Sequence, residues 1–310
     1  MADPNHVAVL GAGVIGASWA ALFLAAGRSV AVYDVAANTE QATRAYIQRA
    51  WPTLTELGLT IRGDPEAVTF HTSPSQAIER AAFVQESVPE RLAIKHALYA
   101  EIEDALDSDA VVATSASGLT LSEMQAGWRD PSRFVLGHPF NPPHLIPLVE
   151  VMGNARTADG VVEAAEGFYE AVGKVTIRVN KEVPGHVANR LQAALWREAI
   201  HLIREGVASV EDVDKAVSAG PGLRWAAMGP TMLFHLGAGE GGISAFCERY
   251  GDSFHRWWDD LGRPRLDEAM ETMLVDGIAD ATVDKTTSSL SAERDALLLA
   301  MQKAIKSRDV

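Results

Sequence analysis

A histidine and a glutamate interrupt the apolar stretch FVLGHPFNPPHLIPLVEVMG, residues 134–153. His138 ends the first apolar run and Glu150 lies in the second, so both ionisable groups belong to segments that read as buried strands. A histidine titrates near neutral pH and can take a proton from a substrate. A carboxylate against its other ring nitrogen fixes the tautomer and stabilises the imidazolium. The pair has the composition of an acid/base dyad, although a histidine in the core and an acid at a strand edge, neither with a catalytic role, would produce the same sequence.

A second candidate site is the segment GAGVIG near the start of the chain. Gly11, Gly13 and Gly16 have the G-x-G-x-x-G spacing, with Val14 and Ile15 between the last two glycines. The first glycine permits a tight turn, the second lets a pyrophosphate approach the backbone, and the third lets the helix pack closely. The spacing alone is weak evidence, but a strand precedes it and a helix follows it. This context predicts a dinucleotide phosphate at the helix N-terminus.

An acid at the end of the next strand indicates which dinucleotide is bound. Asp34 closes the apolar run Ser29–Tyr33, and the following Val35 carries no positive charge. A carboxylate in this place accepts hydrogen bonds from the adenosine ribose hydroxyls and repels a 2′-phosphate. We therefore expect NAD rather than NADP.

Strand and helix patterns alternate over roughly the first 180 residues, which predicts an α/β fold with a Rossmann-type doubly wound sheet. Because ligands bind at the carboxyl ends of such strands, His138 and one of Ser115 and Ser117 are expected in one crevice. The expected elements are strands at 6–10, 29–33, 68–72, 81–88 and 110–117, and helices at 18–26 (with Gly27 as its cap), 38–57, 74–80 and 92–106.

Strand patterns nearly vanish after Val187, where the second part of the chain becomes helical. Val187, Leu191, Leu195, Ala199 and Leu202 form one helical stripe. We place the domain boundary near 182–184, giving an NAD-binding domain at 1–183 and an all-helical substrate and dimerisation domain at 184–310. Further helices are expected at 210–219, 230–236, 243–250, 265–277 and 291–305.

The bulk composition excludes several classes of partner. The net charge of −14 disfavours nucleic acid and anionic membranes, which need a basic face. One cysteine, Cys247, permits no intramolecular disulfide, and no histidine cluster has ligand spacing, so no metal is expected. The first residues lack a signal-peptide pattern and no apolar run is long enough to span a bilayer, which predicts a cytoplasmic protein.

Five motifs, in order, resemble the 3-hydroxyacyl-CoA dehydrogenase superfamily across essentially the whole chain. They are GAGVIG, ESVPERLAIK, TSAS, GHPFNPPHLIPLVEV and PGHVANRL. The resemblance implies that His138 is the catalytic base and Glu150 its orienting acid. It also implies that Ser117 and Asn189 bind the substrate oxygen. A further implication is that the protein forms a homodimer through the helical domain. The positions implied near the nicotinamide half of the cofactor are Glu90, Lys95 and Asn141.

Within this superfamily, two features favour the branch that acts on free acids, which includes L-gulonate 3-dehydrogenase (the lambda-crystallin relatives) and L-carnitine dehydrogenase. The stretch 39–70, which lies over coenzyme A in other members, is short and has no lysine. The segment 220–251 also looks like that of the free-acid branch. An acyl-CoA substrate and a non-enzymatic, crystallin-like NAD-binding protein remain as alternatives.

The resemblance leaves the choice of hydroxy acid open, and the helical half offers two kinds of handle. Arg224 is a candidate for a carboxylate, since a guanidinium binds it bidentately, although it would equally stack on Trp225. A trimethylammonium group would need aromatic faces. Trp196, on the helical face of Asn189, is the candidate here, and Trp225, Phe234, Trp257 and Trp258 are others. Such aromatics also serve as core or dimer contacts.

Overall fold

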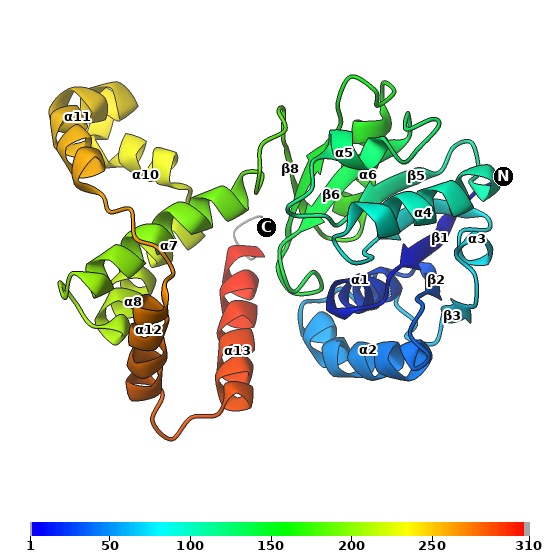
Figure 1. Cartoon of the computed structure of the whole chain (residues 1–310), viewed down its shortest axis with the longest axis horizontal. Coiled ribbons are helices and arrows are strands. Elements are labelled where there is room, and N and C mark those ends of the chain that lie inside the picture. Colours follow the sequence, from blue (N-terminus) through cyan, green and yellow to red (C-terminus); the bar gives the residue numbers. More distant parts are fainter. Residues whose placement is uncertain (1, 307–310) are drawn as a thin grey trace. The chain divides into compact units, whose positions relative to one another are not determined.

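The computed structural model describes residues 2–306 and divides into two compact units (Figure 1). One unit ends at Ala188 and also includes Leu298–Lys303, and the other begins at Asn189. The first unit holds a sheet with helices on both faces, and the second is helical. The predicted fold class, a Rossmann-type unit followed by an all-helical one, is confirmed.

An eight-stranded sheet in the order β3-β2-β1-β4-β5-β6-β7-β8 forms the centre of the first unit. Neighbouring strands are parallel except β6 and β7. The strands are β1 (Asp3–Leu10), β2 (Ser29–Tyr33), β3 (Val68–His71), β4 (Ala81–Glu86), β5 (Val111–Thr114), β6 (Phe134–Pro139), β7 (Leu148–Met152) and β8 (Val175–Arg178).

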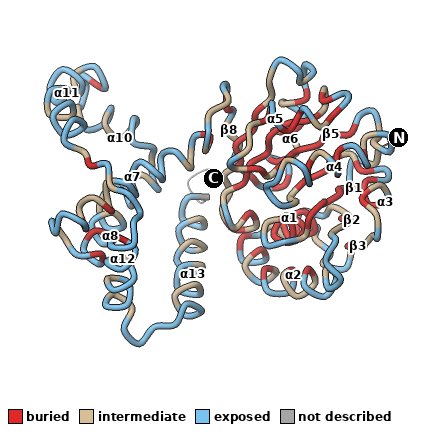
Figure 2. The backbone as a smooth tube through the Cα atoms, viewed as in Figure 1, coloured by how far each residue is buried: buried red, intermediate tan, exposed pale blue. Residues whose placement is uncertain are grey.

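Alternate residues of the central strands build two hydrophobic cores, because successive side chains of a strand point to opposite faces. Val7 and Val9 pack on one face, and Ala8 and Leu10 on the other. Figure 2 shows these strands and the helix α1 as the most buried part of the unit. The first face is covered by α1 (Val14–Ala25), α2 (Thr39–Glu56) and α6 (Val161–Ala171), and the second by α3 (Pro74–Ala77), α4 (Leu92–Ile102) and α5 (Leu121–Gln125).

The antiparallel pairing of β6 and β7 differs from the parallel pairing in the rest of the sheet. The connection, residues 140–147, is too short for the crossover helix that parallel neighbours require. The chain therefore turns back at once, and β7 runs beside β6. Three elements, α5, α6 and β8, were not expected from the sequence pattern.

The helical unit has a small core of its own, and few of its residues are buried (Figure 2). Ile200, Ile203, Val210, Val213 and Met270 form that core. The short helix α9 was not expected, and α11 continues well beyond the predicted end. The helices are α7 (Ala188–Arg204), α8 (Val210–Ala219), α9 (Pro221–Ala227), α10 (Pro230–Gly237), α11 (Gly242–Asp260), α12 (Glu268–Ala281) and α13 (Thr287–Lys306), of which residues 298–303 belong to the first unit.

Across residues 2–306, none of the helices has both the length and the apolar character needed to cross a membrane.

Candidate active site

The turn between β1 and α1 is shaped to accept a phosphate. Gly11 has φ +90°, and a Cβ there would lie 2.6 Å from the carbonyl carbon of Ser87. A Cβ on Gly16 would lie 1.8 Å from the Gly11 oxygen, so only glycine fits at either place. A Cβ on Gly13 would meet nothing within 4 Å, which leaves open space where the turn meets the helix. No side chain caps the N-terminus of α1 at Gly13, so its first N–H groups can bind an anion.

Asp34, directly after β2, is held beside this turn. Its Oδ2 accepts a hydrogen bond from the Ala12 N–H at 2.6 Å, and its Oδ1 accepts one from the Ala36 N–H at 2.9 Å. Each carboxylate oxygen has a further lone pair for a ribose hydroxyl. The neighbouring Val35 is 88% exposed and uncharged. The turn and its acid fit an NAD adenosine and pyrophosphate, as the sequence predicts.

His138 and Glu150 are direct partners across the β6–β7 pair, where the strand register places them opposite each other. The His138 Nδ1 lies 2.7 Å from the Glu150 Oε2, and both side chains are buried. The other carboxylate oxygen, Oε1, accepts the N–H groups of Val187 at 2.8 Å and Ala188 at 3.0 Å, where α7 begins. The structure thus brings the predicted pair into contact.

These contacts keep Glu150 ionised. Burial by itself would raise the pKa of Glu150, but the hydrogen bonds from His138, Ala188 and Val187 hold it below its usual value. An ionised carboxylate only accepts hydrogen bonds, so the His138 Nδ1 carries a proton, and in the neutral imidazole the lone pair is on Nε2. The imidazole is oriented to take a proton on Nε2.

Glu90 holds the turn that contains Ser117, just after β5. Its Oε1 accepts the N–H groups of Ser117 at 2.8 Å and Leu119 at 3.1 Å, and also that of Gly118. Its Oε2 accepts the Ser117 hydroxyl at 3.1 Å. Burial would raise the pKa of Glu90, and these bonds lower it below the usual range. Glu90 therefore fixes the backbone and the hydroxyl of Ser117.

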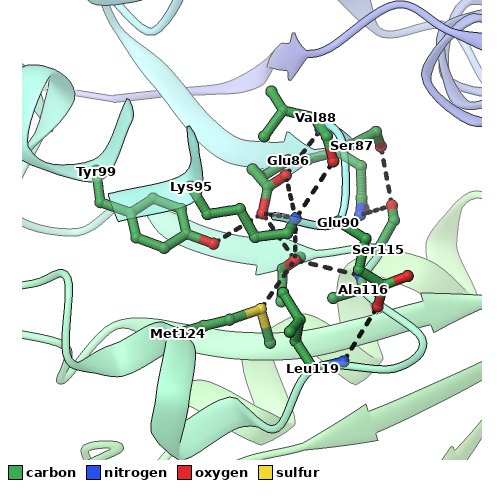
Figure 3. Close-up of polar contacts among 12 residues, drawn as sticks. Glu86, Ser87, Val88, Glu90, Lys95, Tyr99, Ser115, Ala116, Leu119 and Met124 are labelled. Atoms are coloured by element: carbon green, nitrogen blue, oxygen red, sulfur yellow. Dashed lines mark hydrogen bonds and ion pairs between the residues drawn. The ribbon is translucent and has the colours of Figure 1, made fainter. Parts of the chain in front are cut away.

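Lys95 lies on α4 in a buried polar network (Figure 3). Its ammonium is 1% exposed and binds both oxygens of Glu86, at 2.7 and 2.8 Å. Thr114 and Tyr99 donate to the Glu86 Oε2 at 2.7 and 2.8 Å. The network joins the carboxyl ends of β4 and β5 and so supports the segment that carries Glu90. The cofactor contact implied for Lys95 remains a prediction.

Of the two candidate serines, Ser115 is engaged in a separate hydrogen-bond network. Its hydroxyl accepts from Trp19 at 3.2 Å and from Gln85 at 2.9 Å, and lies 2.9 Å from the Ser87 hydroxyl. Asn141 is exposed at the start of the β6–β7 loop, which contains a cis peptide bond between Asn141 and Pro142.

His186, from the motif PGHVANRL, also lies at this site, although its position in the sequence predicts no role for it. Its ring centroid lies 5.2 Å from that of His138, and its Nε2 lies 3.4 Å from the Ala116 oxygen. The side chain is buried, and among the described residues its Nδ1 has no hydrogen-bond partner. Its backbone has φ +48°, a conformation rarely adopted by residues other than glycine. Burial, followed by the proximity of His138, lowers the pKa of His186. No signal in the sequence separates it from a core histidine.

The remaining predicted residues belong to the helical unit. Asn189 is half-buried in the first turn of α7, and Trp196 on the same helix is 51% exposed. Arg224 is exposed on α9, beside the half-buried Trp225. Their roles remain predictions. Within residues 2–306, no three histidine, cysteine or acidic side chains are grouped in a way that would hold a metal ion.

Two family models together match most of the chain. The NAD binding domain of 3-hydroxyacyl-CoA dehydrogenase matches residues 6–183, and the C-terminal domain of the same family matches residues 185–273. The chain belongs to the 3-hydroxyacyl-CoA dehydrogenase family. The family resemblance predicted from the five motifs is confirmed.

Individual relatives in the family are similar over almost the full length. An L-carnitine dehydrogenase of Streptomyces coelicolor is 46% identical over 94% of this chain and 92% of its own length. One from Nocardiopsis dassonvillei is 43% identical over 97% and 91%. Among solved structures, 5-formyl-3-hydroxy-2-methylpyridine 4-carboxylic acid 5-dehydrogenase, an NAD⁺-dependent dismutase, is 29% identical, with a TM-score of 0.84 over 98% of this chain and 99% of that one. The chain is thus an NAD-dependent oxidoreductase that acts on a CH–OH group, and NAD is its cofactor, as predicted.

Proposed function

We propose that this enzyme oxidises the 3-hydroxyl of a small free L-3-hydroxy acid to the 3-oxo acid, and that L-carnitine is its first candidate substrate. The observation that carries the proposal is the similarity to curated L-carnitine dehydrogenases at 38–46% identity over at least 94% of this chain. The buried His138–Glu150 pair supports the chemistry, because it is built to accept one proton.

In the proposed mechanism, the His138 Nε2 accepts the proton of the substrate 3-hydroxyl. NAD held by the glycine turn and Asp34 would supply the acceptor for the hydride of carbon 3. The imidazolium that forms is stabilised through its Nδ1–H by the ionised Glu150. Because two backbone N–H groups already occupy the other Glu150 oxygen, the carboxylate keeps its orientation while the charge on His138 changes.

Two further residues are proposed to hold the substrate oxygen as it changes from hydroxyl to carbonyl. The Ser117 hydroxyl donates to Glu90 at 3.1 Å and can accept a hydrogen bond from a substrate or turn toward it. Asn189 is proposed to contribute its amide. Glu90, Lys95 and Asn141 are proposed to lie on the nicotinamide side of the cofactor.

Carnitine has two charged ends, and the helical unit offers a group for each. Arg224 on α9 is proposed to bind the carboxylate. The trimethylammonium group needs aromatic faces, and Trp196 is the first candidate. A second candidate is an aromatic cluster on α10 and α11, in which Phe234 stacks on Phe246 at 4.6 Å and Phe254 lies 5.1 Å from Trp257.

An acyl-CoA thioester is the alternative substrate, favoured by the activity after which the family is named. The contacts of the arginines on α2 count against it. Arg44 binds Glu40 at 2.9 Å and Glu66 at 3.2 Å, so its charge is already neutralised locally. Arg49 lies over the Tyr46 ring. The phosphates of coenzyme A would need more positive charge than this stretch offers.

A rate comparison tests the proposal. NADH production is measured with L-carnitine, D-carnitine, L-gulonate and 3-hydroxybutyrate, and NADH consumption with acetoacetyl-CoA. We expect kcat/KM to be highest for L-carnitine and lowest for the thioester. A preference for acetoacetyl-CoA would reject the free-acid proposal, and a preference for gulonate would reject carnitine alone.

We also propose a homodimer formed through the helical unit, in a protein that resides in the cytoplasm. Exposed apolar side chains on α7 support the dimer: Leu191 is 65% exposed and Leu195, one turn further, 37%. Such a stripe is costly in water unless it is covered. The solution mass of the full chain tests the dimer, and cell fractionation tests the location.

A further inference from the structure

The loop between β6 and β7, residues 140–147, is short of hydrogen-bond donors. Pro142, Pro143 and Pro147 have no N–H group. The Pro142 carbonyl is satisfied within the loop, because it accepts the N–H groups of Leu145 and Ile146, both at 2.9 Å. The loop cannot satisfy its other carbonyls in this way, so donors must come from elsewhere in the fold.

Lys174 supplies two of these donors. It lies between α6 and β8, and its side chain is almost fully buried, with 6% exposed. Its Nζ lies 2.5 Å from the Pro143 oxygen and 2.6 Å from the Ile146 oxygen. The ammonium is also 5.0 Å from the centre of the Trp19 ring, on α1. One side chain thus joins the loop to the helix whose N-terminus faces the cofactor phosphates.

The loop has a second attachment to the same helix. The His144 N–H donates to the Ser18 hydroxyl at 2.8 Å, and the His144 Nδ1 lies 2.9 Å from that hydroxyl. Ser18 is buried in α1. The loop that follows the His138 strand is therefore attached to α1 at two places, and the exposed Asn141 lies at its beginning.

We propose that Lys174 is a positioning residue for the nicotinamide half of NAD: its two bonds to loop carbonyls hold the β6–β7 loop, and with it Asn141, in place against α1. The proposal rests on the assignment of Asn141 to the nicotinamide side made under the proposed function. Lys174 itself, buried beneath the loop, acts through Asn141 and the loop backbone.

The bonds to the two carbonyls do not require a charged lysine. Burial lowers the pKa of Lys174 to about 7. An ammonium has three N–H donors and a neutral amine has two, which is the number of carbonyls that Lys174 binds. The two bonds to the loop carbonyls are therefore kept on both sides of the titration, whereas the contact with the Trp19 ring is stronger for the ammonium.

Two ligands distinguish positioning of the nicotinamide from general support of the fold. ADP-ribose has the adenosine, pyrophosphate and second ribose of NAD but no nicotinamide. Dissociation constants for NAD and ADP-ribose are measured by calorimetry on the full chain and on Lys174→Met, which has a stem of similar length and no donor. Lys215→Met is the control, because Lys215 is exposed on α8 and pairs with Glu211.

We expect Lys174→Met to weaken NAD about tenfold, while ADP-ribose binding changes by less than about twofold. Lys174→Arg keeps the donors, so its ratio of the NAD to the ADP-ribose dissociation constant should be close to the wild-type ratio. Lys215→Met should leave both dissociation constants unchanged. An equal change for both ligands, or no change for either, would overturn the proposal. If Lys174→Met does not fold, the ratio is measured on Lys174→Gln, whose shorter amide should give a smaller loss with the same selectivity for NAD. Failure of the wild-type enzyme to oxidise L-carnitine would reject the proposed substrate and leave this test intact.

Discussion

The His138 Nδ1 lies 2.7 Å from the Glu150 Oε2 because the antiparallel register of β6 and β7 makes the two residues direct partners. The other Glu150 oxygen accepts the Val187 and Ala188 N–H groups. A single buried carboxylate thus links the candidate base to the backbone of Val187 and Ala188, and each of its oxygens accepts at least one hydrogen bond.

Replacing His138 by Gln tests the proton transfer. The variant keeps a polar side chain and removes the group that accepts the proton, so kcat should fall by about 10³-fold, within the range for general base catalysis. NAD affinity, measured by fluorescence titration, should remain nearly unchanged. Near-normal turnover would remove the proton-transfer role from His138.

Replacing Glu150 by Gln should lower both activity and stability. One Glu150 oxygen accepts a hydrogen bond from His138, and the other accepts two from backbone N–H groups. The amide of glutamine has only one acceptor oxygen. One group of donors would therefore face an NH₂ group. We expect kcat to fall by roughly 10²-fold, as for loss of an orienting partner, with no effect on cofactor selectivity. A variant with wild-type kcat would show that the dyad contact does not serve catalysis.

The same variant should change the acid side of the stability curve. The pKa of Glu150 is lowered in the folded state, so its contribution is present above the unfolded pKa and is lost as the pH falls through the folded pKa. The free energy of unfolding should therefore decline less steeply for Glu150→Gln than for the wild type below about pH 4.5. Urea denaturation at several pH values measures this. Parallel curves would contradict the lowered pKa.

Replacing Asp34 by Ser should weaken NAD and relax the selectivity against NADP. The variant loses charged acceptors for the ribose hydroxyls, each such bond being worth about 1.5–3 kcal/mol, and also the repulsion of a 2′-phosphate. We expect KM for NAD to rise by at least about tenfold while KM for NADP falls. An unchanged ratio of the two constants would count against the ribose contact.

Replacing Lys95 by Met should destabilise the first unit strongly, because Glu86 would be left as an unpaired buried carboxylate. Breaking a buried ion pair from one side costs about 3–5 kcal/mol, whereas replacing both partners costs much less. The double variant Glu86→Gln/Lys95→Met should therefore recover part of the loss. Free energies of unfolding in urea give the comparison. If the loss of stability in the double variant equals the sum of the losses in Glu86→Gln and Lys95→Met, the pair is not coupled.

The pKa of Lys174 predicts a rise of stability with pH. Burial lowers it to about 7, so between pH 7 and the unfolded value near 10.5 the unfolded chain binds more protons than the folded one. The free energy of unfolding should increase with pH across this window, by at most about 1.4 kcal/mol per pH unit. Lys174→Met lacks the titration, so its curve should be flatter there. Equal slopes would show that Lys174 stays protonated in the fold.

Local features of the sequence predicted the glycine turn between β1 and α1 and the position of Asp34 beside it. The glycine spacing and Asp34 are separated by one helix and one strand, and the parallel β1–β2 pair brings them together in any Rossmann unit. The apolar strands likewise predicted the sheet. The Gly11 and Gly16 backbones are then fixed by contacts too close for any Cβ.

The antiparallel turn at β6 could not be inferred from apolar content, because a buried strand looks the same in either direction. Nor could the sequence pair Lys95 with Glu86, or Lys174 with two carbonyls of a distant loop. In each of these contacts, side chains from different elements point into the same buried space. The spacing of residues along the chain does not show in which direction a side chain points in the folded protein.

By itself, the sequence determined which groups this protein has for chemistry: a glycine turn with an acid for NAD, and a histidine and a glutamate on neighbouring strands. Only the tertiary structure decided that the last two touch, since their contact follows from a register set by a short, proline-rich loop. It also decided what holds that loop: prolines lack N–H groups, and two of the missing donors come from Lys174, which the chain reaches only after another helix.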